Sequence, residues 1–229
     1  MPTTVVTGAN RGIGLEFVRQ CLERGDKVIA GCRNPDEAAD LRGLAPAEVL
    51  PVDVGQEASI KDFADSIEEN IDLLINNAGT SATNLGLERS STGVLHAPID
   101  LTLDLIRING LSAASMTRSL LHCLSEGSQV VNITSQIGSM VVGARFDDLP
   151  YSTSKAVMNM VTVQLATQLR DKGITVAAFH PGWVRTDMGG SQADISAEES
   201  AAGILSTIEQ LDHQDSGSFL CWDGSTHPW

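Results

Sequence analysis

The sequence predicts an α/β fold: a doubly wound, seven-stranded parallel sheet with helices on both faces. Two observations support this prediction: short apolar segments alternate with helical segments along the chain, and a glycine-rich turn follows the first apolar segment. Strands of a parallel sheet are buried on both faces and therefore read as nearly continuous apolar runs. Right-handed crossovers place the helices on both faces, and ligands bind beyond the carboxyl ends of the strands.

The elements follow one another in a regular order. The expected strands are short and rich in apolar residues, and they cover 3–6, 27–32, 48–54, 71–76, 129–134, 174–179 and 218–222. Helices are expected between them at about 12–25, 56–69, 101–125, 150–172 and 196–211, whereas 80–100 is expected to be irregular. No repeat, low-complexity segment or linker interrupts this order, which predicts one domain over residues 1–229.

The composition excludes several classes of protein. Hydrophobic residues make up 42% and charged residues 19% of the 229 residues, which is typical of a globular chain. The net charge of −14 disfavours binding to nucleic acid or to anionic membranes. No apolar run approaches the roughly 18 residues that span a bilayer, and the first residues do not resemble a secretory signal. We therefore expect a cytoplasmic protein.

The cysteines and histidines do not have the spacings of a metal site. The four cysteines include no CxxC pair, and the five histidines form neither HxH nor HExxH. We expect free thiols, as in a reducing cytoplasm, and no bound metal.

The segment TGANRGIG, residues 7–14, is the first candidate binding site. It directly follows the first strand and opens the first helix. Glycines permit a tight turn there, and a helix N-terminus presents free N–H groups to a phosphate. The alternative is an ordinary turn between a strand and a helix.

This TGxxxGxG spacing and several later motifs resemble those of the short-chain dehydrogenase/reductase family. The later motifs are NNAG at 76–79, Ser135 after the fifth strand, YxxxK at 151–155 and the PG turn at 181–182. The ending GSFLCWDGSTHPW resembles the C-factor-like and sniffer-like carbonyl reductases of that family. The resemblance covers nearly the whole chain. It implies a Rossmann-type domain that transfers hydride between a nicotinamide and a carbonyl or alcohol.

The end of the second strand indicates which nicotinamide cofactor is bound. In such folds an acidic residue there binds the ribose 2′-hydroxyl of NAD, whereas an arginine accommodates the 2′-phosphate of NADP. Here the usual acidic position holds Cys32, and Arg33 follows it. Arg11 is a second candidate phosphate ligand, although both arginines could instead be ordinary surface residues. The sequence therefore favours NADP(H), with NAD(H) as the alternative.

The catalytic candidates are Ser135, Tyr151, Lys155 and Asn109. Tyr151 and Lys155 are four residues apart and therefore share one face of a helix. A nearby ammonium is expected to lower the pKa of the phenol, so that Tyr151 can exchange a proton with the substrate oxygen. Ser135 can donate a hydrogen bond to that oxygen. The resemblance implies that Lys155 also holds the nicotinamide ribose and that Asn109 supports the lysine through a water.

The resemblance also implies a set of cofactor contacts. Asp53 and Val54 match the family's adenine-contacting pair, and Val184 and Thr186 match residues that contact the carboxamide or pyrophosphate. The full expected set is Gly8, Asn10, Arg11, Gly12, Ile13, Gly14, Arg33, Asp53, Val54, Asn77, Ala78, Gly79, Tyr151, Lys155, Pro181, Gly182, Val184 and Thr186.

The substrate pocket departs from the common family pattern. Ser135 and Tyr151 are 16 residues apart, about three more than in many members, and the extra residues fall within 139–150. We expect pocket walls from 80–96, 136–148 and 183–195. The short segment that follows Met188 predicts a small lid and an open pocket, unless it is only a connecting loop.

The sequence also leaves two other functions and the oligomeric state open. The main rival is a nucleotide-binding regulatory or signalling protein of C-factor type with little turnover, which a complete catalytic set argues against. An epimerase or dehydratase is disfavoured by the short C-terminal region. The long helices at 101–125 and 150–172 form the dimer interface in many family members. We expect a homodimer, although their apolar faces could equally pack within one chain.

Overall fold

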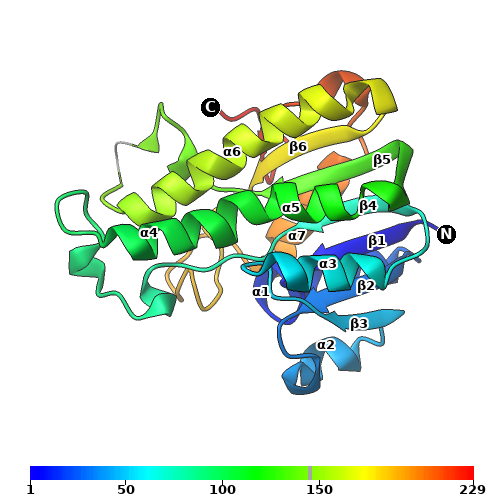
Figure 1. The fold of residues 1–229 in the computed structure, drawn as a ribbon, viewed down its shortest axis with the longest axis horizontal. Helices are drawn as coiled ribbons and strands as arrows, with labels where there is room; N and C mark the ends of the chain where they lie inside the picture. Colours follow the sequence, from blue (N-terminus) through cyan, green and yellow to red (C-terminus); the bar gives the residue numbers. More distant parts are fainter. Residues whose placement is uncertain (144–145) are drawn as a thin grey trace.

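The computed structural model describes residues 1–143 and 146–229, and these contain a parallel seven-stranded sheet flanked by helices (Figure 1). The strand order is β3-β2-β1-β4-β5-β6-β7, so the direction of winding reverses between β1 and β4. The strands are β1 (Thr3–Thr7), β2 (Lys27–Cys32), β3 (Glu48–Pro51), β4 (Ile71–Asn76), β5 (Leu124–Ile133), β6 (Thr175–His180) and β7 (Phe219–Cys221). All neighbouring strands are parallel, which confirms the predicted fold class.

The helices form two layers, one on each face of the sheet. They are α1 (Gly12–Glu23), α2 (Ala39–Gly43), α3 (Glu57–Asp65), α4 (Ile99–Leu105), α5 (Ser112–Ser119), α6 (Leu149–Leu169) and α7 (Ala197–Ile208). One buried apolar cluster joins α1 and α7 to the sheet, and the other joins α3, α5 and α6 to its opposite face (Figure 1). The short helix α2 was not predicted.

The long helical stretch expected near 101–125 is present over 99–119, but it is not α-helical throughout. The region contains α4, a single π-helical stretch (Ile106–Leu111) and α5, and the helical part of the region ends before β5 begins at Leu124. Gly110 lies in the π stretch, where an added Cβ would be 2.8 Å from the Ser154 carbonyl oxygen of α6. The expanded turn thus brings two helices into close backbone contact, and π turns of this kind often occur at functional sites.

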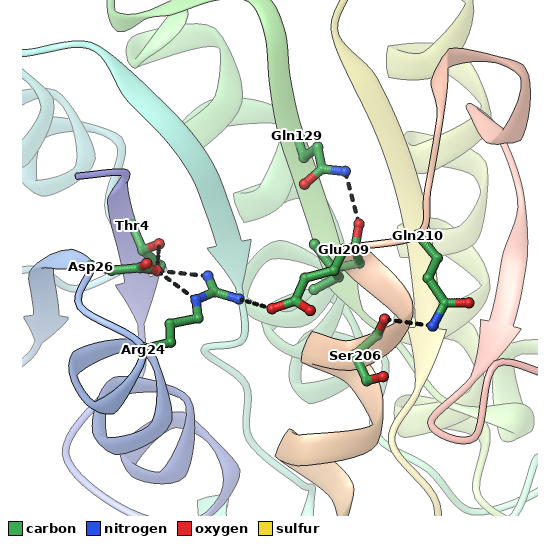
Figure 2. A network of polar contacts seen from close by, with 8 residues as sticks. Thr4, Arg24, Asp26, Gln129, Ser206, Glu209 and Gln210 are labelled. Atoms are coloured by element: carbon green, nitrogen blue, oxygen red, sulfur yellow. Dashed lines mark hydrogen bonds and ion pairs between the residues drawn. The ribbon is translucent and has the colours of Figure 1, made fainter.

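At the amino ends of the strands, a buried carboxylate ties α1 to the sheet (Figure 2). Asp26 accepts hydrogen bonds from Thr4 Oγ1 at 2.8 Å and from Arg24 Nε and Nη2 at 2.9 and 2.6 Å. Arg24 also pairs with Glu209 just after α7, so the network joins the two helices of one layer. This end of the sheet is held by paired charges.

No helix in the described ranges is both long enough and apolar enough to cross a bilayer. Residues 1–143 and 146–229 also contain no cluster of three or more potential metal ligands. All four cysteines are free thiols, and Cys21, Cys32 and Cys123 are buried.

Candidate active site

The glycine turn between β1 and α1 leaves the N-terminus of α1 open. Gly8 and Gly12 have φ angles of +66° and +56°, a region that L side chains rarely adopt. A Cβ on Gly14 would lie 2.2 Å from the Gly8 carbonyl oxygen, so only glycine allows the helix to approach the turn. The first turn of α1 has no capping side chain and no acidic residue. Its free N–H groups and positive dipole end are therefore available to a phosphate.

The NNAG segment fixes the position of this glycine turn through hydrogen bonds. Asn77 Nδ2 donates to the carbonyl oxygens of Thr7 and Gly8 at 2.9 and 3.2 Å. Thr7 Oγ1 accepts from the backbone N–H groups of Asn77 and Ala78, each at 3.1 Å. A Cβ on Gly8 would lie 2.7 Å from Ala78 Cα, which again requires glycine. No role was predicted for Thr7, although a threonine at a strand end before a glycine is a recognisable signal.

The other residues of the turn divide between surface and core. Asn10 and Arg11 are exposed at its tip, whereas Ile13 packs against the apolar cluster under α1. Arg11 Nη1 lies 3.0 Å from Asp187 Oδ2, so this exposed ion pair connects the glycine turn to the segment after β6. Arg11 was expected to be a phosphate ligand or an ordinary surface residue, and its pairing with Asp187, 176 residues away in the chain, was not predicted.

Arg33 directly follows the end of β2 at Cys32. Its side chain is exposed and forms no hydrogen bond or ion pair with any residue in the described ranges. Cys32, directly before it, is 2% exposed and belongs to the core. The guanidinium of Arg33 is therefore free to bind an anion near the carboxyl end of β2.

Four other cofactor candidates lie in two turns that follow β3 and β6. Asp53 Oδ1 accepts from the Gly55 N–H at 2.9 Å, which closes the turn after β3, and Val54 packs against the apolar cluster under α3. In the segment after β6, Gly182 has φ +85°, and an added Cβ would lie 2.6 Å from Ile195 Cδ1. This packing holds the turn formed by Pro181 and Gly182.

The segment after the PG turn lies against the glycine turn. Thr186 Cγ2 would be 3.2 Å from a Cβ on Gly12, which places the threonine beside the N-terminus of α1. Its hydroxyl accepts from the Gly189 N–H at 3.1 Å, and Val184 is buried. Two stretches far apart in the chain thus flank the same helix end.

The catalytic candidates meet where β5 ends and α6 begins. Asp148 caps α6 by accepting a hydrogen bond from the Tyr151 N–H at 3.1 Å. Lys155 lies one turn later, with its Nζ 5.8 Å from the centroid of the Tyr151 ring. Ser135 begins the 3₁₀ turn (Gln136–Gly138), in which a Cβ on Gly138 would be 2.6 Å from the Lys155 carbonyl carbon. The turn that carries Ser135 is therefore packed directly on α6 at the lysine.

Lys155 is a buried cation without a carboxylate partner in the described part of the chain. It is 4% exposed, and its Nζ donates to the Ile133 carbonyl oxygen at 2.8 Å and contacts Met158 Sδ at 3.9 Å. Burial lowers the pKa of Lys155 to about 7. The charge of this group is therefore responsive near neutral pH, as is common at functional sites.

The expectation that Lys155 lowers the pKa of Tyr151 was wrong. Burial, together with the nearby carboxylate of Asp148, raises the pKa of Tyr151 to about 12. Lys155 does not offset this desolvation, because its Nζ donates to the Ile133 carbonyl oxygen and forms no hydrogen bond with the Tyr151 hydroxyl in the described part of the chain. Tyr151 therefore carries its proton at neutral pH, which is the state required to donate it to a carbonyl oxygen.

Asn109, in the π stretch, joins three parts of the site. Its Nδ2 donates to the Thr80 carbonyl oxygen at 2.8 Å and to Ser154 Oγ at 3.0 Å, while its Oδ1 accepts from the Thr80 N–H at 2.8 Å. Ser154 Oγ in turn donates to the Tyr151 carbonyl oxygen at 2.7 Å. The side chain thus holds the segment after Gly79 against α6, and it forms no direct hydrogen bond with Lys155. Thr80 and Ser154 are site residues that the motifs did not reveal.

Two loops with exposed apolar side chains follow β4 and β5. Thr92 Oγ1 donates to the Asp147 carbonyl oxygen at 3.0 Å, which joins the loops to each other beside the start of α6. The exposed apolar side chains on them are Leu85, Val94, Leu95, Met140, Val141 and Phe146. The expected pocket wall at 136–148 is described except for residues 144 and 145, which lie outside the described residues.

The fold and site define a nucleotide-binding α/β protein with a tyrosine–lysine centre at the carboxyl ends of its strands. Residues 2–196 match the family model described as short chain dehydrogenase, and the chain belongs to this family. The C-signal protein of Myxococcus xanthus is 36% identical over 161 residues, which are 69% of this chain and 93% of that protein.

Two solved structures agree with this chain over its whole length. The NADPH-bound carbonyl reductase from chicken fatty liver has a TM-score of 0.90 and 32% identity, and the alignment covers 100% of this chain and 99% of that one. The carbonyl reductase Sniffer of D. melanogaster has a TM-score of 0.91 and 27% identity, with both chains covered completely. The expected resemblance to C-factor-like and sniffer-like proteins is confirmed.

Proposed function

We propose that this protein is an NADPH-dependent carbonyl reductase in which Tyr151 protonates the substrate oxygen. The observation that carries the proposal is the placement of a protonated tyrosine one helical turn from a buried lysine, beside the turn of Ser135. Similarity to an NADPH-bound carbonyl reductase supports the same activity. The active unit is proposed to be one domain over residues 1–229.

The residues around the glycine turn fit a dinucleotide phosphate. The open N-terminus of α1 offers N–H donors, and the glycines leave room for a ligand against the backbone. Arg33, free beside the end of β2, is proposed to bind the 2′-phosphate, with Arg11 as a second ligand. Arginine binds phosphate through paired charge-assisted hydrogen bonds, which favours NADP(H) over NAD(H).

The roles of the catalytic residues follow from their protonation and contacts. Bound NADPH supplies the hydride. Ser135 donates a hydrogen bond to the carbonyl oxygen, and Tyr151 transfers its proton to the same oxygen as negative charge develops there. Lys155 orients the nicotinamide ribose and provides positive charge beside the phenol. Asn109 holds the loop after β4 against α6 through its hydrogen bonds to Thr80 and Ser154.

The alternative expected from the sequence, a signalling protein with little turnover, is not favoured, because the chain belongs to the short chain dehydrogenase family and is similar to an NADPH-bound carbonyl reductase. A protein that only binds the nucleotide would not require Ser135 and Tyr151 at the site. Turnover of simple ketones and aldehydes therefore separates the two functions.

We also propose a homodimer and a cytoplasmic location. The exposed apolar side chains Ile99, Leu103, Leu111 and Met160 lie along α4, the π stretch and α6, the helices expected to pair. Light scattering after gel filtration tests the dimer, and Leu103→Glu is expected to give monomers.

The first experiment is calorimetric titration of the protein with NADPH and with NADH. Preference for NADPH is expected, and Arg33→Ala should weaken NADPH binding by about tenfold or more, since a charge-assisted hydrogen bond contributes about 1.5–3 kcal/mol. Binding of NADH should change little in that variant. Equal affinity for both cofactors in the wild type would contradict the proposed phosphate site, while leaving the family assignment intact.

A further inference from the structure

One buried hydrogen bond connects the end of β5 to α6 beside the catalytic residues. Thr134 Oγ1 donates to Asn159 Oδ1 at 2.6 Å, and the two residues are 1% and 5% exposed. Thr134 stands between Ile133, whose carbonyl oxygen binds Lys155 Nζ, and Ser135. Asn159 lies one turn beyond Lys155 on the same face of α6. The bond therefore joins the neighbours of both catalytic groups.

Only one of the two polar groups of the Asn159 amide, the Oδ1 oxygen, has a hydrogen-bond partner among the described residues. Its Nδ2 is buried and has no hydrogen-bond partner among the described residues. A buried donor without a partner costs free energy, and an apolar side chain of similar size would avoid that cost. What the asparagine supplies in return is an acceptor for Thr134. The Thr134 hydroxyl otherwise has only the more distant Lys155 carbonyl oxygen, at 3.4 Å.

A second hydrogen-bonded pair, Asn132 and Thr162, also joins β5 to α6 and serves as a structural comparison. Asn132 Nδ2 donates to Thr162 Oγ1 at 2.9 Å, and Asn132 Oδ1 accepts from Asn76 at 2.9 Å. Thr162 Oγ1 donates onward to the Met158 carbonyl oxygen. Both side-chain groups of this asparagine are satisfied, and Thr162 follows Lys155 by seven residues along α6, compared with four for Asn159. It is a matched control for Thr134 and Asn159.

We propose that Thr134 and Asn159 are positioning residues for the reduction. Their hydrogen bond holds the last residues of β5 against α6, so that the Ile133 carbonyl oxygen keeps Lys155 in place and Ser135 stays opposite Tyr151. This inference rests on the proposed roles of Ser135, Tyr151 and Lys155. It predicts that loss of the bond impairs chemistry more than stability.

The test compares Asn159→Leu, Thr134→Val and the double variant with the control Thr162→Val. For each, kcat is measured per cofactor site, counted by titration with NADPH, together with KM for a ketone, Kd for NADPH and Tm. Each single variant is expected to lower kcat about tenfold, because small misplacements of catalytic groups have effects of this order or larger. KM for the ketone should stay within about twofold, since the substrate loops are untouched.

The double variant should be no worse than either single variant, because both remove the same bond. Thr134→Ser, which restores the hydroxyl, should recover most of the kcat lost in Thr134→Val. Thr162→Val should lower Tm while kcat stays within about twofold of wild type, as expected for a residue remote from chemistry. The Kd for NADPH should rise about fivefold in Asn159→Leu, since one hydrogen bond from a displaced lysine accounts for that factor. This readout does not depend on turnover.

Three results would overturn the inference: wild-type kcat and Kd in Asn159→Leu and Thr134→Val, an equal loss of kcat in Thr162→Val, or additive losses in the double variant. Tyr151→Phe separates this failure from failure of the proposed function. If Tyr151→Phe is inactive and Asn159→Leu behaves as wild type, only the positioning role falls. If Tyr151→Phe retains full activity, the proposed mechanism falls with it.

Discussion

The two ends of the parallel sheet differ in the partners of their buried charged side chains. At the amino ends, Asp26 accepts hydrogen bonds from Thr4 and from Arg24, so that its charge is balanced within the protein (Figure 2). At the carboxyl ends, Lys155 is buried with a carbonyl oxygen and a thioether sulfur as its contacts, and its pKa falls to about 7.

The difference follows from the cost of burying an ion. A buried charge loses its hydration, and only a partner of opposite charge with good hydrogen bonds recovers that loss. The amino end therefore contributes to stability, whereas the unpaired lysine at the carboxyl end is retained at the expense of stability. Such a group is typical of a site that binds or reacts.

The largest effect expected at the carboxyl end is on chemistry. Tyr151→Phe removes the proton donor and should lower kcat for ketone reduction by about 10²–10⁴-fold, the usual contribution of general acid catalysis. NADPH affinity and Tm should change little, because the ring remains. Steady-state kinetics with NADPH and a ketone panel measure the effect, and a wild-type rate would contradict the assigned role.

A substitution at the amino ends of the strands should change the stability of the protein and not its chemistry. Asp26→Ala removes the acceptor of Thr4 and leaves Arg24 with only Glu209, and it should lower the free energy of unfolding by about 3 kcal/mol, the loss typical of breaking a buried ion pair. Urea denaturation followed by circular dichroism measures this loss. The kcat per NADPH-binding site, determined well below the midpoint of unfolding, should match wild type. A large fall in that kcat would show that the two ends are not separate in function.

Replacing Lys155 by an apolar residue should have the opposite effect: higher stability and loss of turnover. Lys155→Met removes a buried charge and should raise the free energy of unfolding by about 2 kcal/mol near pH 6.5, while abolishing turnover. The pKa of Lys155 is lower in the folded than in the unfolded chain, so between about pH 7 and pH 10 the unfolded chain binds the extra proton. Wild-type stability therefore rises with pH across that window.

The advantage of Lys155→Met should accordingly be complete below pH 7 and shrink as the pH rises toward 10. Urea titrations of both proteins without cofactor at about pH 6.5 and pH 9.5 measure this difference. A destabilised variant, or a difference that does not change with pH, would contradict the account of Lys155 as an unpaired buried cation.

The smallest effect concerns the exposed pair of Arg11 and Asp187. Asp187→Asn frees Arg11 and should tighten NADPH binding by at most about fivefold, since exposed ion pairs contribute about 0.2–1 kcal/mol. The gain should be larger for NADPH than for NADH, which lacks the 2′-phosphate. Asp171→Asn, which changes the net charge equally at the amino end of β6, is the control. An equal gain in that control would show an effect of net charge alone.

Much of this protein was determined by local sequence patterns. Apolar runs, the glycine turn and the order of NNAG, Ser135, YxxxK and PG predicted the strand positions, the parallel sheet and the location of the site at the carboxyl ends. Each of these signals spans only a few residues, within which backbone geometry and the period of burial constrain the residue types. The same patterns did not reveal the π stretch within the helical segment near 101–125, where Gly110 lies in close backbone contact with the distant helix α6.

Only the tertiary structure decided which side chains meet and what charge they carry. Thr134 and Asn159 are 25 residues apart in the chain, and Arg11 and Asp187 are 176 apart, so no spacing rule connects them. The raised pKa of Tyr151 and the lowered pKa of Lys155 likewise result from burial by elements distant in sequence. A local motif specifies the residue types of a catalytic centre, whereas desolvation and long-range hydrogen bonds are properties of the packed fold.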